Sequence, residues 1–230
     1  GPVGLRVSLL FAAFALLVLY HVGMLYVPWP FHVKHDPTYP ALEPLMRLSN
    51  PWRMGLLFVI SGVATGLMLG RSGLAGERSR RLLLPLLLGM AVIVPPQSWL
   101  QVRGQFGYAG STLDFLRLYF TAYGGFCQGQ QCLALPTWNH LWFLPYVWAY
   151  TLLCLLALHA LPAAWLRRAA GRVAVAMTGS HGWRLLLLPL VFLAAVRVLL
   201  FPRFGETHAL LDDWAAHAVF LPLFAFGLLL

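Results

Sequence analysis

The chain carries the stretch WRMGLLFVISGVATGLMLG at residues 52–70 and the stretch LLLPLLLGMAVIVP at residues 82–95. With their flanking aromatic and small residues, both are about long enough to cross the hydrocarbon core of a bilayer. A basic hairpin at residues 71–81, RSGLAGERSRR, joins them and sets Arg71, Arg78, Arg80 and Arg81 against the single acid Glu77. Such a basic cluster between two spans either fixes membrane topology or holds a polyanionic ligand at the membrane face.

The composition is that of an integral membrane protein. Of 230 residues, 60% are hydrophobic and 10% are charged, and the mean hydropathy is +0.75. A soluble domain has roughly 25% charged residues. The net charge of +9 does not indicate a nucleic-acid binder, because the arginines lie in short loops beside apolar stretches.

The pattern predicts an all-α, polytopic bundle of transmembrane helices with the N-terminus in the cytoplasm. On that topology nine arginines face the cytoplasm with Glu77 as their only acid, whereas six acids match the six cations outside. The chain opens on Gly1 and stops at Leu230 inside an apolar run. We therefore expect one membrane domain over residues 1–230, a piece of a longer protein with both ends cut. The six predicted spans are residues 6–27, 52–70, 82–100, 140–161, 184–201 and 214–230.

The long outer loop, residues 101–139, holds two further features. Its segment Leu113–Phe126 is too short and too charged to span, so we interpret it as an interfacial or re-entrant helix. Cys127 and Cys132 flank the sequence Gln-Gly-Gln-Gln in the same loop. They can form a small disulfide in an oxidising compartment or remain two free thiols, and the sequence leaves both open.

His21 is the main candidate for chemistry. It lies in the first span, about 9 Å below the outer boundary at 1.5 Å per residue. An ionisable side chain at that depth tends to face the bundle interior, where a histidine can accept or give a proton. The alternative is a neutral imidazole hydrogen-bonded to a neighbouring helix.

Other cationic and aromatic residues could contact a substrate or a cofactor. Arg53, His140 and Trp142 begin spans on the same side as His21, and each is a candidate substrate contact. His140 and Trp142 could equally be interfacial anchors. Arg78 and Arg81 form an Arg-x-x-Arg pair whose guanidinium groups suit phosphate oxygens, or they serve topology alone.

The remaining polar residues give weaker signals. Arg197, inside the fifth predicted span, either pairs with a carboxylate outside this chain or extends past Phe201 to the interface. His32 and His35 stand beside Asp36, a weak suggestion of a metal site against a plain solvated loop. We predict no metal and no permanently bound cofactor.

Four stretches together resemble the membrane acyltransferase 3 family, and within it most the glucans biosynthesis protein C branch. Their order and spacing also match, over about residues 10–160, and beyond residue 160 the resemblance is only hydrophobic. The stretches are LLVLYHVGMLYV in the first span, NPWRMGLLFVISGVATGLML in the second, RRLLLPLLLGMAVIVPPQ at the third and WNHLWFLPYVWAY at the fourth.

The resemblance implies a multi-pass protein of the bacterial inner membrane with about ten spans. Such proteins move an acyl group from cytoplasmic acyl-CoA to a carbohydrate on the far side. In the glucan branch the group is typically succinyl and the acceptor a periplasmic glucan. His21 matches the family's first-span histidine, the expected acid/base, and Arg78 and Arg81 match the Arg-x-x-Arg expected near the CoA phosphates. The expected partners are acyl-CoA, a carbohydrate acceptor and membrane lipids, with no nucleic acid.

The chain departs from the family pattern in one place. The family usually carries an arginine eleven positions before the histidine, where this chain has Leu10, and the nearest arginine is Arg6. Either Arg6 lines the same path deeper in the membrane or the start of the chain is altered. A second function also stays open, a transporter or lipid-binding membrane protein without chemistry, with His21 and Arg197 in a proton or anion path.

Overall fold

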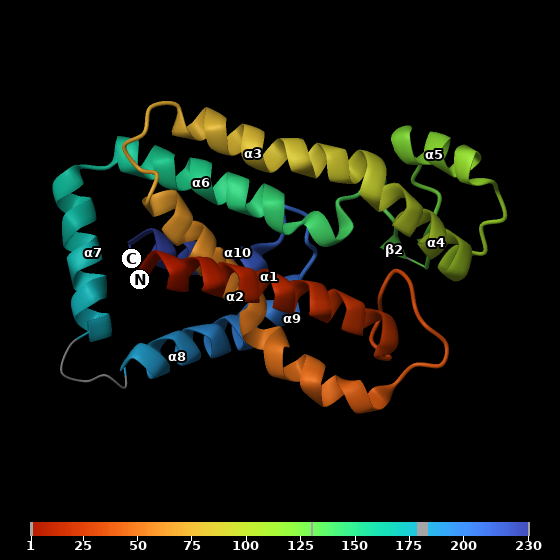
Figure 1. The fold of residues 1–230 in the computed structure, drawn as a ribbon, viewed down its shortest axis with the longest axis horizontal. Helices are drawn as coiled ribbons and strands as arrows, with labels where there is room; N and C mark the ends of the chain where they lie inside the picture. The colour runs from red at the N-terminus through yellow and green to blue at the C-terminus, as the bar shows by residue number, and fades with distance from the viewer. Residues whose placement is uncertain (1, 130, 179–183, 230) are drawn as a thin grey trace. The chain divides into compact units, whose positions relative to one another are not determined.

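The protein is described by a computed structural model of residues 2–129, 131–178 and 184–229, in which nearly all regular structure is helical (Figure 1). The predicted all-α class is confirmed. The fold divides into two compact units. The first unit comprises Gly1–Met54 and Leu83–Leu141, and the second comprises Gly55–Leu82 and Trp142–Leu230.

The helices follow one another closely along the chain, and a two-stranded antiparallel ribbon, β1–β2, interrupts them once among the described residues. In chain order the elements are α1 (Pro2–Tyr26), the 3-10 turn η1 (Pro40–Leu42), α2 (Glu43–Gly66), α3 (Leu74–Leu88), the π-helical turn η2 (Gly89–Ile93), α4 (Val94–Phe106), α5 (Thr112–Phe120), β1 (Cys127–Gln128), β2 (Gln131–Cys132), the 3-10 turn η3 (Asn139–Leu141), α6 (Phe143–Ala160), α7 (Ala163–Thr178), α8 (Arg184–Leu199), α9 (Phe201–Phe204) and α10 (Trp214–Leu229).

Two helices of the described residues are long and apolar enough to cross a membrane. They are Leu74–Phe106, with 33 residues, and Asn139–Ala160, with 22 residues. Phe11–Tyr26 and Trp214–Leu229 are shorter apolar helices. These lengths agree with a membrane protein, whereas the six predicted spans and the cytoplasmic N-terminus stay predictions.

The segment at residues 71–81 is less of a hairpin than the sequence indicated. Gly73 adopts a left-handed backbone with φ of +76°, and α3 begins directly after it at Leu74, which is buried. Glu77 lies in the first turn, where a carboxylate interacts favourably with the positive end of the helix dipole. Arg78 and Arg81 therefore lie in the opening turns of a helix.

A π-helical turn joins α3 to α4, so that Leu74–Phe106 is one continuous helix. Pro95 and Pro96 follow the turn and lack the amide hydrogens that would bond carbonyls one turn earlier. Such a disruption is a common cause of local π-helical geometry. The first two turns of α4 carry Gln97 and Gln101.

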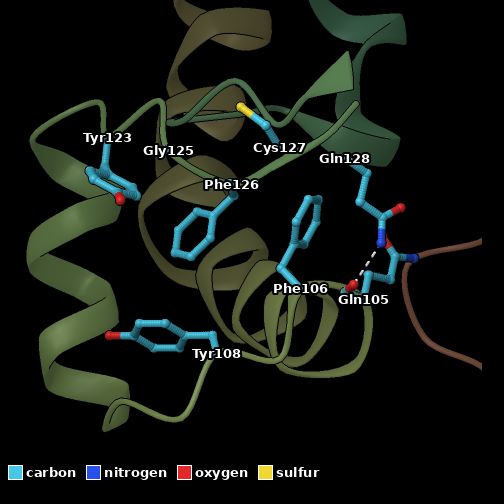
Figure 2. A pocket seen from close by; sticks show the side chains of 8 residues that line it. All are labelled: Gln105, Phe106, Tyr108, Tyr123, Gly125, Phe126, Cys127 and Gln128. Carbon is cyan, nitrogen blue, oxygen red and sulfur yellow. Dashed lines mark hydrogen bonds between the residues drawn. The ribbon is translucent and has the colours of Figure 1, made fainter. Parts of the chain in front are cut away.

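The loop after α4 folds onto α4 with a small aromatic core of its own. Phe115, Tyr119 and Phe126 are buried in it, and the Tyr119 hydroxyl lies 2.9 Å from the Met90 carbonyl oxygen and 3.0 Å from that of Thr137. The segment predicted as an interfacial helix is helical only in α5, whose N-cap is Ser111. Cys127 and Cys132 form a disulfide across the β1–β2 ribbon, and a pocket opens beside it (Figure 2).

Within the second unit, α2 meets α10 through glycines. A Cβ added at Gly62 would collide with the backbone of α10 at Phe224, and one added at Gly227 would collide with the Val59 carbonyl. Gly66 also faces α10, at the Leu228 carbonyl, so the two glycines of α2 form a G-x-x-x-G face. Small residues at this spacing let helix backbones approach closely inside a bilayer.

Gly62→Ala is expected to lower the unfolding free energy by about 1–3 kcal/mol, because the new methyl group meets backbone rather than a movable side chain. Thermal unfolding of the purified protein in detergent measures the change. Gly76→Ala is the matched control, since a Cβ at this helical glycine meets nothing within 4 Å. Equal melting temperatures for Gly62→Ala and the unaltered protein would contradict the close crossing.

Candidate active site

His21 lies in the last two turns of α1, and one hydrogen bond fixes its ring. Its Nδ1 is 2.8 Å from the carbonyl oxygen of Leu17, one turn earlier. A carbonyl oxygen only accepts, so Nδ1 must carry the proton in this bond. In the neutral ring the proton is then absent from Nε2, which keeps a lone pair available to take a proton from another group.

His140 lies beside His21 in the first unit. The two ring centroids are 5.9 Å apart in an edge-to-face arrangement. The Nδ1 of His140 is 3.1 Å from Oε1 of Gln97 on α4. Asn139, directly before it, adds a hydrogen bond of 3.4 Å from Nδ2 to the Ser98 hydroxyl. The first turn of α4 after the π-helical turn thus holds His140 next to His21.

His32 joins the same cluster from the loop between α1 and α2. Its Nδ1 is 2.8 Å from Oε1 of Gln101, which lies four residues after Gln97 and so on the same face of α4. Burial lowers the pKa of His32, the hydrogen bond to Gln101 acts in the opposite direction, and the nearby His21 lowers this pKa further.

Arg53 and Tyr20 form the other side of this region, within the first unit. The Tyr20 hydroxyl donates to Oδ1 of Asn50 at 2.8 Å, and the Cζ of Arg53 lies 3.2 Å from the centroid of the Tyr20 ring. Arg53 is only 6% exposed, and neither its Nε nor its Nη1 has a hydrogen-bond partner among the described residues. Tyr20 precedes His21, so a buried and incompletely paired cation stands close to the candidate base.

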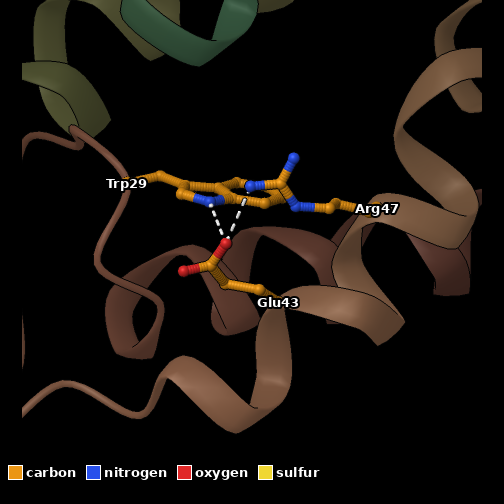
Figure 3. Close-up of polar contacts among 3 residues, drawn as sticks. All are labelled: Trp29, Glu43 and Arg47. Carbon is orange, nitrogen blue, oxygen red and sulfur yellow. Dashed lines mark hydrogen bonds and ion pairs between the residues drawn. The ribbon is translucent and has the colours of Figure 1, made fainter.

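A surface clamp holds the start of α2 against the loop that follows α1 (Figure 3). One oxygen of Glu43 accepts from the Trp29 indole at 3.1 Å and from the Arg47 guanidinium at 2.9 Å. The guanidinium also lies over the indole, 5.4 Å from its centroid. The hydrogen bonds from Arg47 and Trp29 lower the pKa of Glu43. The clamp helps to set where α2 presents Asn50 and Arg53.

The basic pair Arg78 and Arg81 lies in the second unit. The Nη2 of Arg78 donates to the Ser61 carbonyl at 3.2 Å and to the Thr65 hydroxyl, and its Nε is buried without a partner among the described residues. Arg81 pairs with Glu77 at 2.6 Å, and 63% of its side chain is exposed. Arg78 therefore faces α2 inside its unit, whereas Arg81 is open to a ligand.

Three other predicted residues belong to the second unit or lie outside the described side chains. Trp142 is in the second unit, with its ring 4.4 Å from that of His208 and 5.2 Å from that of Tyr146. Arg197, also in the second unit, is exposed and lies over the Phe201 ring at 3.5 Å. The side chain of Arg6 is outside those that the structure describes.

The residues 2–129, 131–178 and 184–229 contain no group of three or more histidines, cysteines and acids that could hold a metal ion. His32 bonds to Gln101, whereas Nδ1 of the neighbouring His35 lies 2.9 Å from the Pro37 carbonyl oxygen. Gln97, Gln101 and Tyr20 were not predicted from the sequence as site residues. Two glutamines at i and i+4 directly after the apolar run of α3 were an available signal for a polar helix face.

Comparison with known proteins gives one match. A family model for the acyltransferase 3 group, described as an acyltransferase domain, matches residues 11–230. No curated protein and no solved structure matches the chain.

The pKa of His32 is expected to lie below the ordinary imidazole value of about 6.5. Gln101→Leu should lower it further, because the bond that favours the charged ring is lost. NMR titration of histidine-labelled protein measures both values, with Gln128→Leu as control. Because the folded pKa is below the unfolded one, the unfolded chain binds more protons between them, and His32 reduces stability as pH falls through this window. A midpoint at or above the ordinary value would contradict the burial.

Proposed function

The chain belongs to the acyltransferase 3 family, and from this premise we propose that it moves an acyl group from cytoplasmic acyl-CoA to a hydroxyl of a periplasmic glucan or related carbohydrate. Family membership supports a membrane acyltransferase in general. The donor, the acceptor and the catalytic role of His21 are the proposal. The hydrogen bond between Nδ1 of His21 and the Leu17 carbonyl carries it, because it leaves Nε2 as a proton acceptor.

In the proposed reaction His21 acts as a general base and then as a general acid. Nε2 takes the proton of the acceptor hydroxyl while the hydroxyl oxygen bonds to the thioester carbonyl carbon. The carbon–sulfur bond then breaks, and the proton passes from the imidazolium to the CoA thiolate. The products are an O-acyl ester and CoA. His140, held 5.9 Å away between ring centroids, is a candidate contact for the acceptor.

The burial and unpaired donors of Arg53 support the proposal that the transferred acyl group carries a free carboxylate, as succinyl does. A buried guanidinium with unpaired donors is costly unless an anion pairs with it. The ion pairs of the described residues do not include Arg53. We infer that the free carboxylate of the acyl group supplies the missing charge, since a guanidinium fork matches a carboxylate well.

Arg78 and Arg81 are proposed to contact the CoA phosphates, and Trp142 the acceptor. The exposed guanidinium of Arg81 supports a phosphate contact, which would compete with its pair to Glu77. We further propose a multi-pass protein of the bacterial inner membrane, with the six predicted spans, a cytoplasmic N-terminus and lipids as its surroundings. No resident metal or cofactor enters the proposed reaction.

The alternative function is a non-enzymatic transporter or lipid-binding protein with His21 and Arg197 in a proton or anion path. The guanidinium of Arg197, near the end of α8, is exposed and makes a cation–π contact with Phe201. This arrangement gives no particular support to a proton or anion relay. The two functions differ in whether CoA is released. Uptake of a substrate without release of CoA would favour the alternative.

His21→Ala is expected to lower the rate of acyl transfer at least about 100-fold, the range that a positioned general base contributes. The assay follows radiolabelled acyl-CoA into a gluco-oligosaccharide, with the protein reconstituted in liposomes. His159→Ala, which removes an exposed histidine of α6, serves as the matched control and should keep full activity. Transfer retained by His21→Ala would remove this histidine from the mechanism.

Arg53→Ala is expected to lower kcat/KM about 10- to 100-fold for succinyl-CoA, which corresponds to the loss of one charged hydrogen-bonding group. The same change should alter kcat/KM for acetyl-CoA by no more than about threefold, because the acetyl group has no free carboxylate. Arg117→Ala, which removes an exposed arginine of α5, is the matched control. Equal losses with both donors would reject recognition of a carboxylate by Arg53.

A further inference from the structure

The outer loop of the first unit contains a cavity of about 430 Å³ that the proposed reaction does not use. Figure 2 shows aromatic rings along one side of it and two glutamines on the other. Its main side chains are Phe106, Tyr108, Tyr123, Phe126, Gln105 and Gln128.

The rings are arranged around Phe126. Tyr123 lies 5.1 Å and Tyr108 5.5 Å from its centroid, both edge-to-face, and Phe106 lies 6.0 Å away. Phe126 is only 7% exposed, whereas Tyr123 is 43% exposed. The pocket therefore has a fixed aromatic floor and an accessible ring at its edge. The faces of such rings carry negative charge density and attract the weakly positive C–H groups of a ligand.

The polar part of the lining is uncharged. Nε2 of Gln128 donates to the Gln105 carbonyl at 2.7 Å, and Nε2 of Gln105 lies 3.3 Å from the Phe31 carbonyl oxygen. Oε1 of Gln105 also accepts from Nε2 of Gln101 at 3.1 Å. Both glutamines are exposed, and each primary amide carries a second N–H besides the one in these bonds. No lysine, arginine or acid lines the cavity. A ligand that suits it is neutral and presents both hydroxyls and C–H faces.

The rim of the pocket is constrained by covalent and backbone contacts. The Cys127–Cys132 disulfide closes the ribbon, and the Leu133 amide donates to the Phe126 carbonyl at 2.8 Å. The Tyr123 ring folds over Gly125, where an added Cβ would collide with its hydroxyl. Closing a short loop limits the conformations that binding must freeze, which favours recognition by a formed site.

We propose that this pocket binds a neutral carbohydrate and docks the glucan acceptor at a distance from the reacting hydroxyl. The pyranose faces stack on Tyr123 and Tyr108, and the ring hydroxyls bond to the amides of Gln105 and Gln128. That the bound carbohydrate is the glucan acceptor rests on the proposed function. The pocket as a sugar site stands on its own geometry. Binding energy from a remote part of a substrate of this kind lowers KM for long acceptors.

Titration calorimetry with purified protein in nanodiscs tests the site, using linear gluco-oligosaccharides of five units (β-1,3-, β-1,4- and α-1,4-linked). The measurement uses the His21→Ala protein, so that binding is read without turnover. Tyr123→Ala in that background is expected to raise Kd at least about tenfold for whichever pentasaccharide binds, the loss of one stacking platform. Tyr123→Phe, which keeps the ring, should change Kd by no more than about threefold.

Phe120→Ala removes an exposed aromatic side chain of α5 outside the pocket and is the matched control. Absence of binding by all three pentasaccharides, or equal Kd values for Tyr123→Ala and the control, would overturn the site. Binding that depends on Tyr123 without any acyl transfer by the unaltered protein would reject the proposed function and keep the pocket. Transfer with a KM for pentasaccharide that Tyr123→Ala leaves unchanged would reject the pocket alone.

Discussion

The hydrogen bond from Nδ1 of His21 to the Leu17 carbonyl is the constraint on which the proposed chemistry depends. In an α-helix that carbonyl normally accepts from the amide of residue 21, so the imidazole shares an acceptor already oriented along the helix axis. The ring cannot turn without losing its partner, and its tautomer follows from the chemistry of the acceptor. A base is useful only when its lone pair points to one place, and this short-range contact within α1 supplies that property.

Charge gives the second constraint. The first unit buries the guanidinium of Arg53 against Tyr20 and gathers the imidazoles of His21, His32 and His140 in the same region. These groups are all cationic when protonated. Burial lowers the pKa of His32, and the buried guanidinium of Arg53 favours an anionic ligand. The polar face of α4 supports this arrangement through Gln97 and Gln101, which accept from imidazoles without adding charge. The π-helical turn before them sets which face of α4 they occupy.

The sequence predicted the helical class, and it singled out His21, Arg53 and His140, because apolar runs and ionisable residues within them are local signals. It could not predict that His140 lies against His21, since the two are 119 positions apart and the chain between them has to fold first. Residues 71–81 were interpreted as a hairpin because they are mostly small or charged, which gives no sign that Leu74 is buried and begins a helix. The close α2–α10 contact was readable from Gly62 and Gly66, a G-x-x-x-G spacing that was not used. The Cys127–Cys132 pairing was left open, because spacing alone fits thiols and a disulfide equally.

The tautomer of His21 decides whether Nε2 can serve as the proposed base. Nitrogen NMR of the protein labelled with ¹⁵N-histidine distinguishes protonated from unprotonated ring nitrogens, and the His21→Gln variant assigns the resonance. The hydrogen bond to Leu17 predicts that the neutral ring carries its proton on Nδ1 and keeps a free lone pair on Nε2. A neutral His21 with its proton on Nε2 would contradict it, because that ring could neither donate to Leu17 nor accept the hydroxyl proton at the assigned nitrogen.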